Sequence, residues 1–246
     1  MKTMIGVMGS VANFNDQASD LSFRLGKAIA EHRCAIITGA CPGLPHDAVL
    51  GARSAGGLTV GVSPGHNFAE HTIKYGSPWK EYDVLIYTGS GLMGREITGV
   101  RSCDIVVLVG GRSGTLGEFS IAYDEGKLIG VLQGTGGIAE HVSTLVEVIN
   151  KNTGAQIVYD DDPYRLITRL VELNAARRQT MSQGLFMAPL LSPNGDSDER
   201  HNIEGIQQAI AAMEKEIQRL QSGIAEQEKR LECYLDLATM GSPEKG

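Results

Sequence analysis

The first 180 residues alternate between short apolar runs and segments with helical periodicity, and this alternation limits the fold more than any other feature. Buried strands are predicted at Met4 to Gly9, Cys34 to Thr38, Leu58 to Val62, Asp83 to Tyr87, Asp104 to Val109, Leu128 to Leu132 and Gln156 to Tyr159. Each run is nearly continuous in apolar residues, without alternation between apolar and polar side chains. That pattern is typical of parallel strands that are covered on both faces of a sheet.

The segments between these runs have apolar residues at helical spacing. One apolar stripe has Leu21, Leu25, Ala28 and Ile29, a second has Ala48, Ala52 and Ala55, and a third has Leu145, Val148 and Ile149. Strands and helices that alternate at this pitch are joined by right-handed crossovers into one sheet. The sequence therefore predicts an α/β fold with a doubly wound parallel sheet.

The composition changes near residue 180, and the chain divides there into a predicted domain and an appendage. Residues 1–178 form the predicted domain, and 179–202 have the composition of a linker, with Gly184, Pro189, Pro193 and Gly195. Residues 203–238 have apolar residues at alternating spacings of three and four, which predicts a coiled-coil helix. The seam has Ile203, Ile206, Ile210, Met213, Ile217, Leu220, Ile224, Gln227, Leu231 and Tyr234. The alternative is one amphipathic helix that folds back onto its own domain.

Composition and charge restrict the class of protein. The chain has 246 residues, 42% hydrophobic and 21% charged, which is ordinary for a globular protein. Its apolar runs are far shorter than the roughly 18 residues of a membrane-spanning helix, and the N-terminus has no secretory pattern. We therefore predict a cytoplasmic protein without a membrane partner. The net charge of -7 argues against broad nucleic-acid binding but allows a small anionic ligand in a local pocket.

Cysteine and histidine spacing does not indicate a metal site. Cys34, Cys41, Cys103 and Cys233 contain no C-x-x-C pair, so we predict reduced and mostly buried thiols. His66 and His71 are interpreted as ordinary loop histidines.

Glycine-rich segments follow four of the predicted strands. They are Gly9-Ser10, Thr38 to Gly43, Gly61 to Gly65 and Gly110 to Thr115. Ligands of open parallel sheets bind beyond the carboxyl ends of the strands, where small residues let the backbone approach them. In the fourth segment, the amides of Ser113, Gly114 and Thr115 would face an anion at the positive end of a helix dipole. Such glycines also serve purely steric roles, but four at one edge favour a nucleotide-type site.

Two common nucleotide motifs are missing from the places where they normally act. The first strand is not followed by G-x-G-x-x-G, and no G-x-x-x-x-G-K-[ST] loop occurs. The predicted ligand is therefore a mononucleotide or a nucleotide-like cofactor.

Several of these segments resemble the LONELY GUY (LOG) family of the SLOG superfamily, long mislabelled as lysine decarboxylases. The segment from Gly110 to Glu118 is similar to the family motif P-G-G-x-G-T-x-x-E, and Arg95 stands 23 residues before Glu118, as in the family pattern. The loop Thr38 to Leu44 resembles the earlier G-G-G-x-x-G-L loop, and Ala55-Gly56-Gly57 with Gly61-Val62-Ser63-Pro64 matches the next strand. The resemblance covers roughly residues 3 to 175.

This resemblance implies a Rossmann-like fold, usually dimeric, that binds a nucleoside 5′-monophosphate. LOG enzymes hydrolyse the N-glycosidic bond to free base and ribose 5-phosphate, whereas related molybdenum-cofactor carrier proteins only bind their ligand. Glu118 would be the catalytic carboxylate that stabilises the oxocarbenium-like state, and Arg95 would hold the phosphate or ribose. The resemblance and the loops together assign ligand contacts to Gly9, Ser10, Gly39, Gly43, Gly111, Arg112, Ser113, Gly114, Thr115 and Arg101. No cofactor is required; a bound nucleotide or molybdenum cofactor is the expected small-molecule partner.

The sequence departs from the family pattern at several positions. Gly110 replaces the motif proline and Arg112 replaces a motif glycine, while Ala40 and Cys41 replace glycines of the earlier loop. Glu96 stands where a lysine commonly follows the motif arginine, which reverses a charge beside the predicted site. These changes indicate a sister group with a different ligand.

Both catalytic candidates could instead have a purely structural role. Thr115-Leu116-Gly117-Glu118 is also a helix capping box. Arg95 could lie on a helix surface opposite an apolar face of Met93, Ile97 and Val100. Three hypotheses therefore stay open: a nucleoside-monophosphate glycosidase, a binding protein that carries or senses its ligand, and a structural oligomer with a vestigial site.

Overall fold

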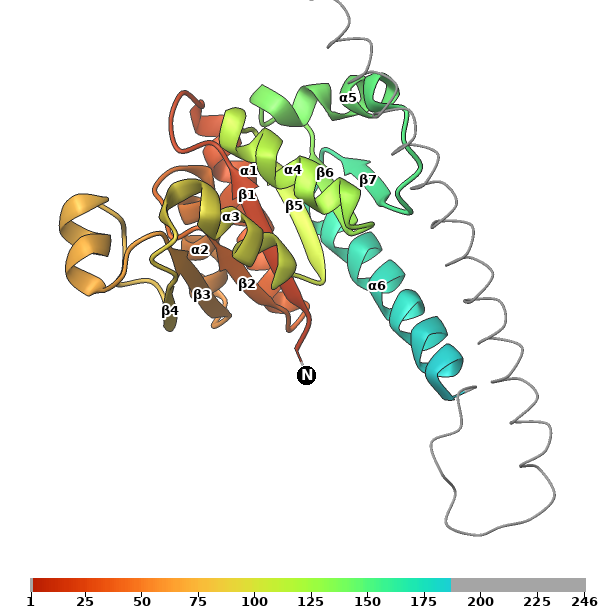
Figure 1. Ribbon diagram of the computed structural model, residues 1–246, viewed down its shortest axis with the longest axis horizontal. Coiled ribbons are helices and arrows are strands. Elements are labelled where there is room, and N and C mark those ends of the chain that lie inside the picture. Colours follow the sequence, from red (N-terminus) through yellow and green to blue (C-terminus); the bar gives the residue numbers. More distant parts are fainter. Residues whose placement is uncertain (1, 187–246) are drawn as a thin grey trace, which may run out of the picture. The chain divides into compact units, whose positions relative to one another are not determined.

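The computed structural model describes residues 2–186, with side chains up to residue 180, and shows a sheet of seven parallel strands (Figure 1). The strands are β1 (Met4–Gly9), β2 (Ala35–Thr38), β3 (Leu58–Ser63), β4 (Val84–Tyr87), β5 (Ile105–Val109), β6 (Leu128–Leu132) and β7 (Gln156–Asp160). Their order is β4-β3-β2-β1-β5-β6-β7. The chain thus builds one half of the sheet outward from β1 and then returns to build the other half from β5. The switch between the halves lies between β1 and β5.

Helices cover both faces of the sheet. They are α1 (Asp16–Glu31), α2 (Leu44–Ser54), α3 (Gly91–Arg101), α4 (Ser113–Asp124), α5 (Val142–Ile149) and α6 (Pro163–Phe186), with a π-helical turn at Glu70–Lys74 and a 3-10 turn at Gly137–His141. One core cluster joins the sheet to α1, α2 and α6, and contains Leu25, Ala48 and Leu166. The second joins the opposite face to α3, α4 and α5, and contains Val100 and Phe119. The result is a three-layer arrangement.

The predicted fold class is confirmed, since all seven predicted strands are present and pair in parallel. Two expectations of burial were wrong. The edge strand β4 exposes Val84 and Ile86, because it has a neighbour on one side only. In α5, Val148 and Ile149 are exposed, so this short helix buries its first turn instead of the predicted stripe.

The cysteines that the structure describes are free thiols: Cys34 and Cys103 are buried and Cys41 is half-buried. His71 corrects the sequence interpretation, because its ring is fully buried and lies 2.9 Å from the Ser63 hydroxyl and 3.0 Å from the Pro78 carbonyl oxygen. It fastens the segment after β3 instead of lying in an open loop. His66, in contrast, is exposed beside Glu70.

The chain divides into a compact unit of Met1–Arg178 and a second unit of Gln179–Gly246. Helix α6 runs to Phe186 and therefore includes residues 179–186, which the sequence analysis assigned to the linker. The rest of the predicted linker, the heptad seam of residues 203–238 and Cys233 lie outside the described residues. Within residues 2–186, no helix is long and apolar enough to cross a membrane.

Candidate functional site

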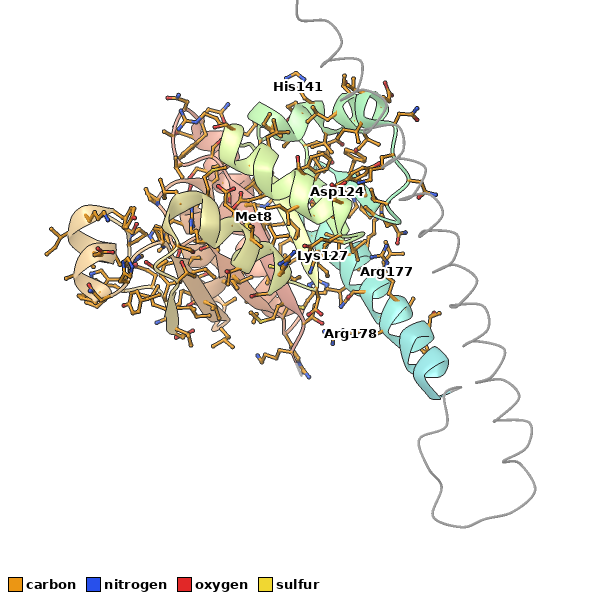
Figure 2. All side chains as sticks on the ribbon, in the orientation of Figure 1. Met8, Asp124, Lys127, His141, Arg177 and Arg178 are labelled. Atoms are coloured by element: carbon orange, nitrogen blue, oxygen red, sulfur yellow. The ribbon has the colours of Figure 1, made fainter. Side chains whose placement is uncertain are left out.

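A cavity of about 230 Å³ lies at the carboxyl edge of the sheet, beside the switch point between β1 and β5. It is bounded by the end of β1, the loop after β2, the middle of α3 and the first turns of α4. The lining residues are Val7, Met8, Gly9, Ser10, Val11, Gly39, Cys41, Pro45, Arg95, Glu96, Arg112, Ser113, Gly114, Thr115 and Glu118. Figure 2 labels Met8 of this lining and, at the other end of α4, Asp124. Segments far apart in the sequence therefore meet at the predicted place.

The N-terminus of α4 presents unpartnered amides to this cavity. Arg112 is the N-cap residue, and its side chain makes no capping hydrogen bond. The amide of Leu116 is the first to bond within the helix, to the Arg112 carbonyl oxygen at 2.9 Å. The amides of Ser113, Gly114 and Thr115 therefore have no acceptor in the helix. They form a concentration of positive potential that suits an anion.

The two glycines before α4 hold the loop in place and do not offer free amides. Gly111 donates to the Ser10 hydroxyl at 2.6 Å, and Gly110 donates to the Thr135 hydroxyl at 2.8 Å. Both glycines have positive φ, which explains why no other residue suits this turn. Ser10 therefore ties the loop after β1 to the loop after β5.

The glycines after β1 and β2 have different tasks. Gly9 lines the cavity, where a β-carbon would collide with the Val109 backbone. Gly43 is absent from the lining: it caps α2 with a φ of +88° and packs against the backbone of Ser10 and Val11. Its predicted contact with the ligand is therefore replaced by a steric role.

Arg95 reaches from α3 over the ends of β2 and β3. Its guanidinium donates to the Gly39 carbonyl oxygen and, at 3.5 Å, to that of Val62. A β-carbon on Gly39 would overlap the guanidinium, so the glycine makes the space that Arg95 occupies. The Nε atom is buried and has no partner. Arg95 is thus held by backbone oxygens, and its Nε donor has no acceptor among the described residues.

Two carboxyl groups share the cavity with Arg95. Glu118 and Glu96 are each 8% exposed. Burial raises the pKa of Glu118 to about 8; the Arg95 charge opposes this rise and Glu96 adds to it. Burial also raises the pKa of Glu96, against the effect of Arg95. Glu118 is therefore mainly uncharged at neutral pH.

Three sequence interpretations are corrected here. Thr115 and Glu118 do not form a capping box, because the helix begins earlier, at Ser113. The apolar-face alternative for α3 is wrong, since Met93 and Ile97 are exposed while Arg95 and Glu96 line the cavity.

The third correction concerns Arg101, which the structure does not bring to the cavity. It forms an ion pair with Glu125 at 2.7 Å, beyond the C-terminus of α4. Lys127, labelled in Figure 2, donates to the carbonyl oxygens of Arg101 and Cys103. Arg101 therefore belongs to the opposite end of α4 from the candidate anion site.

Sequence reasoning missed Glu96 and Cys41 as lining residues. Glu96 was noted only as a charge reversal, although Gly114 and Gly117 offered a further signal. These two glycines lie one turn apart on α4 and leave the space in which the Glu96 carboxyl sits. Burial raises the pKa of the Cys41 thiol, so Cys41 stays protonated and unreactive at neutral pH.

A second, more open cavity of about 660 Å³ adjoins the first and shares Ser10 and Arg112 with it. The loop after β1, with Asn13 and Asn15, and the glycine-rich loop after β6 line it. Arg112 is exposed between the two cavities and forms no ion pair with any described residue. Within residues 2–186, no group of three or more His, Cys, Asp or Glu side chains could hold a metal ion.

Comparison with known proteins supports the predicted family. The model of the SLOG cluster4 family matches residues 2–167, which is most of the chain. This protein belongs to the SLOG cluster4 family. It is also 32% identical over 139 residues to an uncharacterized protein of Archaeoglobus fulgidus, covering 54% of this chain and 82% of that one. The predicted nucleotide-binding SLOG type is therefore confirmed at the level of the family.

Two solved structures with the same fold come from proteins whose names state the ligand that they bind or carry. The molybdenum cofactor binding protein of the phototrophic bacterium Rippkaea orientalis is 26% identical, with a TM-score of 0.59, over 70% of this SLOG chain and 98% of the other. The Moco carrier protein of Chlamydomonas reinhardtii is 29% identical, with a TM-score of 0.58, over 72% and 99% of the two chains.

Proposed function

We propose that this SLOG protein binds a small phosphorylated ligand of the nucleotide class and acts as a binding protein, not as a hydrolase. The observation that carries the proposal is the set of unpartnered amides at Ser113, Gly114 and Thr115, which face a cavity that also receives Arg95 and Arg112. A phosphate in this position receives hydrogen bonds from the amides, the favourable end of the helix dipole and two guanidinium charges.

The surroundings of Glu118 favour binding over hydrolysis by the LOG route, in which this glutamate acts as a charged carboxylate. In that role it must be ionised to stabilise the positive charge that develops when the N-glycosidic bond breaks. Burial raises the pKa of Glu118 to about 8, so most of the population is neutral at pH 7. The lysine of the LOG pattern, which would lower this pKa, is replaced by Glu96. The similar structures of molybdenum cofactor binding and carrier proteins agree with a binding role.

Hydrolysis of a nucleoside 5′-monophosphate is the second candidate function. It is favoured by one observation, namely that Arg95 and Glu118 line the same cavity. Incubation of the protein with a panel of nucleoside monophosphates, followed by chromatography for free base, distinguishes the candidates. We expect no release of base. If base were released and Glu118→Gln lowered the rate about a hundredfold, roughly 2.7 kcal/mol of barrier, hydrolysis would replace binding as the function.

The phosphate site is tested by Gly114→Val. The side chain of a valine at this position would press on Glu96 and fill the space before the amides, since a β-carbon there already lies 3.2 Å from Glu96 Oε1. Calorimetry should show at least a tenfold loss of affinity for nucleoside monophosphates. Ser120→Val is the matched control: it places the same β-branched side chain on an exposed position of α4, outside the cavity. Equal affinities of the two variants would contradict the placement of the phosphate.

Both ligand candidates carry a phosphate that fits the N-terminus of α4. The remainder of the molybdenum cofactor fits less well. The molybdenum cofactor has a dithiolene near its phosphate, and the anionic sulfur atoms of a dithiolene need donors, while the cavity places the carboxyl group of Glu96 beside the phosphate position. A nucleotide is therefore the ligand that these residues support better.

A further inference from the structure

Two buried carboxyl groups in the cavity lack a partner in the protein. Glu96 and Glu118 are each more than nine-tenths buried. Among residues 2–186, neither carboxyl group forms a hydrogen bond or an ion pair with a protein side chain or backbone group. Their oxygen atoms are not sealed off, since the fully buried polar side-chain atoms without a partner in this part of the chain are His46 Nδ1 and Arg95 Nε. Both carboxyl groups line the cavity and open onto it, so a ligand there can supply the donors that they lack.

The position of Glu96 limits where those donors are found on the ligand. Its Oε1 and Oε2 atoms lie 3.2 Å and 3.1 Å from the points where β-carbons of Gly114 and Gly117 would stand. The Glu96 carboxyl group is therefore packed against the first turns of α4, beside the amides that would hold the phosphate. An ionised phosphate offers acceptors only. The donors must belong to the chemical group that directly follows the phosphate.

The size of the cavity agrees with a small group at this point. Its volume of about 230 Å³ is below the roughly 300–1,000 Å³ of pockets that enclose a complete small ligand. It suits a phosphate with its sugar, while the base of a nucleotide would project beyond it. In a 5′-ribonucleotide, the sugar carries two vicinal hydroxyl groups, both of which donate hydrogen bonds.

We propose that Glu96, with Glu118 beside it, accepts hydrogen bonds from the 2′- and 3′-hydroxyl groups of a ribose whose 5′-phosphate lies at the N-terminus of α4. The ligand is then a 5′-ribonucleotide, and deoxynucleotides and the molybdenum cofactor are disfavoured. This inference rests on the proposed function, because it takes the phosphate position as given. Glu96 is the residue that determines specificity for the sugar.

Calorimetry with AMP and GMP, each beside its 2′,3′-dideoxy form, tests the inference on the unmodified full chain. We expect the dideoxy forms to bind at least about tenfold more weakly, since a hydrogen bond to a charged group contributes about 1.5–3 kcal/mol. Glu96→Ala should lower the ratio of the dideoxynucleotide dissociation constant to the ribonucleotide dissociation constant at least threefold. Glu147→Ala, on the exposed face of α5, is the control and should leave the ratio unchanged. Thermal unfolding confirms that each variant is folded.

The outcomes separate this inference from the proposed function. Equal binding of ribo and dideoxy forms by the unmodified protein would overturn the ribose assignment and leave the phosphate site standing. Tighter binding of molybdenum cofactor than of any ribonucleotide would overturn it as well. An unchanged ratio in a folded Glu96→Ala variant would overturn the role of Glu96. If AMP, GMP, ribose 5-phosphate and inorganic phosphate all failed to bind, the proposed function itself would be wrong.

Discussion

At the scale of single residues, Glu118 shows how a buried carboxyl group makes stability depend on pH. Its pKa is raised by burial to about 8, from an ordinary value of 4.5. Between these two values the folded protein binds a proton that the unfolded chain releases. The stabilisation is therefore fully present below about pH 4.5 and is lost as the pH rises through about 8.

Glu118→Gln should remove this dependence, because the amide does not ionise. The variant should match the parent protein in free energy of unfolding at pH 4, and should exceed it at pH 9 by on the order of a few kcal/mol. Urea unfolding from pH 4 to pH 9 measures the difference. The exposed substitution Glu147→Gln serves as control. The prediction would be wrong if the free energy of unfolding changed with pH in the same way for Glu118→Gln and the parent protein. Glu118 would then not be a buried charge at high pH.

The residues of the site differ in how far the sequence could predict them. Arg95 and Glu118 follow from the spacing of the family motif. Glu96 is not predictable in this way, because its burial depends on the packing of α3 against Gly114 and Gly117 of α4. Arg101 was misplaced for a related reason. It lies six residues after Arg95, about 9 Å farther along the helix axis, and only the tertiary structure shows that this distance carries it out of the site.

At the scale of elements, helix α4 combines an uncapped N-terminus with a candidate binding site. Arg112 occupies an extended N-cap conformation, with φ -130° and ψ -148°, but its side chain does not cap the helix. Natural N-caps such as Asp satisfy the first amides and stabilise a protein by about 0.5–2 kcal/mol. The absence of a cap keeps these amides available to a ligand.

Arg112→Asp should therefore raise stability and lower affinity together. The carboxylate would cap α4, increasing the free energy of unfolding by about 1 kcal/mol, while it repels a phosphate and removes a guanidinium from the cavity. Affinity for nucleoside monophosphates should fall at least tenfold by calorimetry. Arg101→Asp makes the same charge change at the other end of α4, and should leave affinity within about twofold. A more stable Arg112→Asp variant with unchanged affinity would contradict the anion site.

The elements themselves were largely predictable, because continuous apolar runs separated by helical periodicity allow few arrangements other than a parallel sheet. Edge position is a property of strand order, and strand order was not predicted. The exposure of Val84 and Ile86 in β4 could therefore not be foreseen. The short α5 has a strong apolar stripe in sequence, yet Val148 and Ile149 find no layer to cover them within residues 2–186.

At the scale of the whole molecule, we propose that the predicted C-terminal coiled coil joins copies of the chain. The seam in residues 203–238 contains mainly Ile and Leu, and burial of each such side chain contributes about 1.5–3 kcal/mol. Gln227 is the polar seam residue that would fix the register. The exposed Met93 and Ile97 of α3 give the compact unit an apolar surface of its own, suited to the dimer implied by the family resemblance. The expected assembly is therefore larger than a dimer.

Truncation after Asn202 tests this assembly. Light scattering should show a lower mass per particle for the truncated chain, and calorimetry should show unchanged nucleotide affinity, because the cavity lies within Met1–Arg178. The same number of protomers before and after truncation would exclude self-association through the seam. The tail would then pack against its own domain or bind a different protein. The predicted cytoplasmic location and the absence of nucleic-acid binding stay predictions.

The pairing of β1 with β5 also has a consequence for the order of events in folding. The Met4 amide donates to the Asp104 carboxylate at 2.8 Å across 100 residues of chain, and the same junction carries the Ser10–Gly111 bond that shapes the cavity. Closing so long a loop is entropically costly and slow. A ligand finds its site only after this closure, so it should bind the native state and not the folding transition state. Added nucleotide should then slow unfolding in stopped-flow experiments while the refolding rate stays constant.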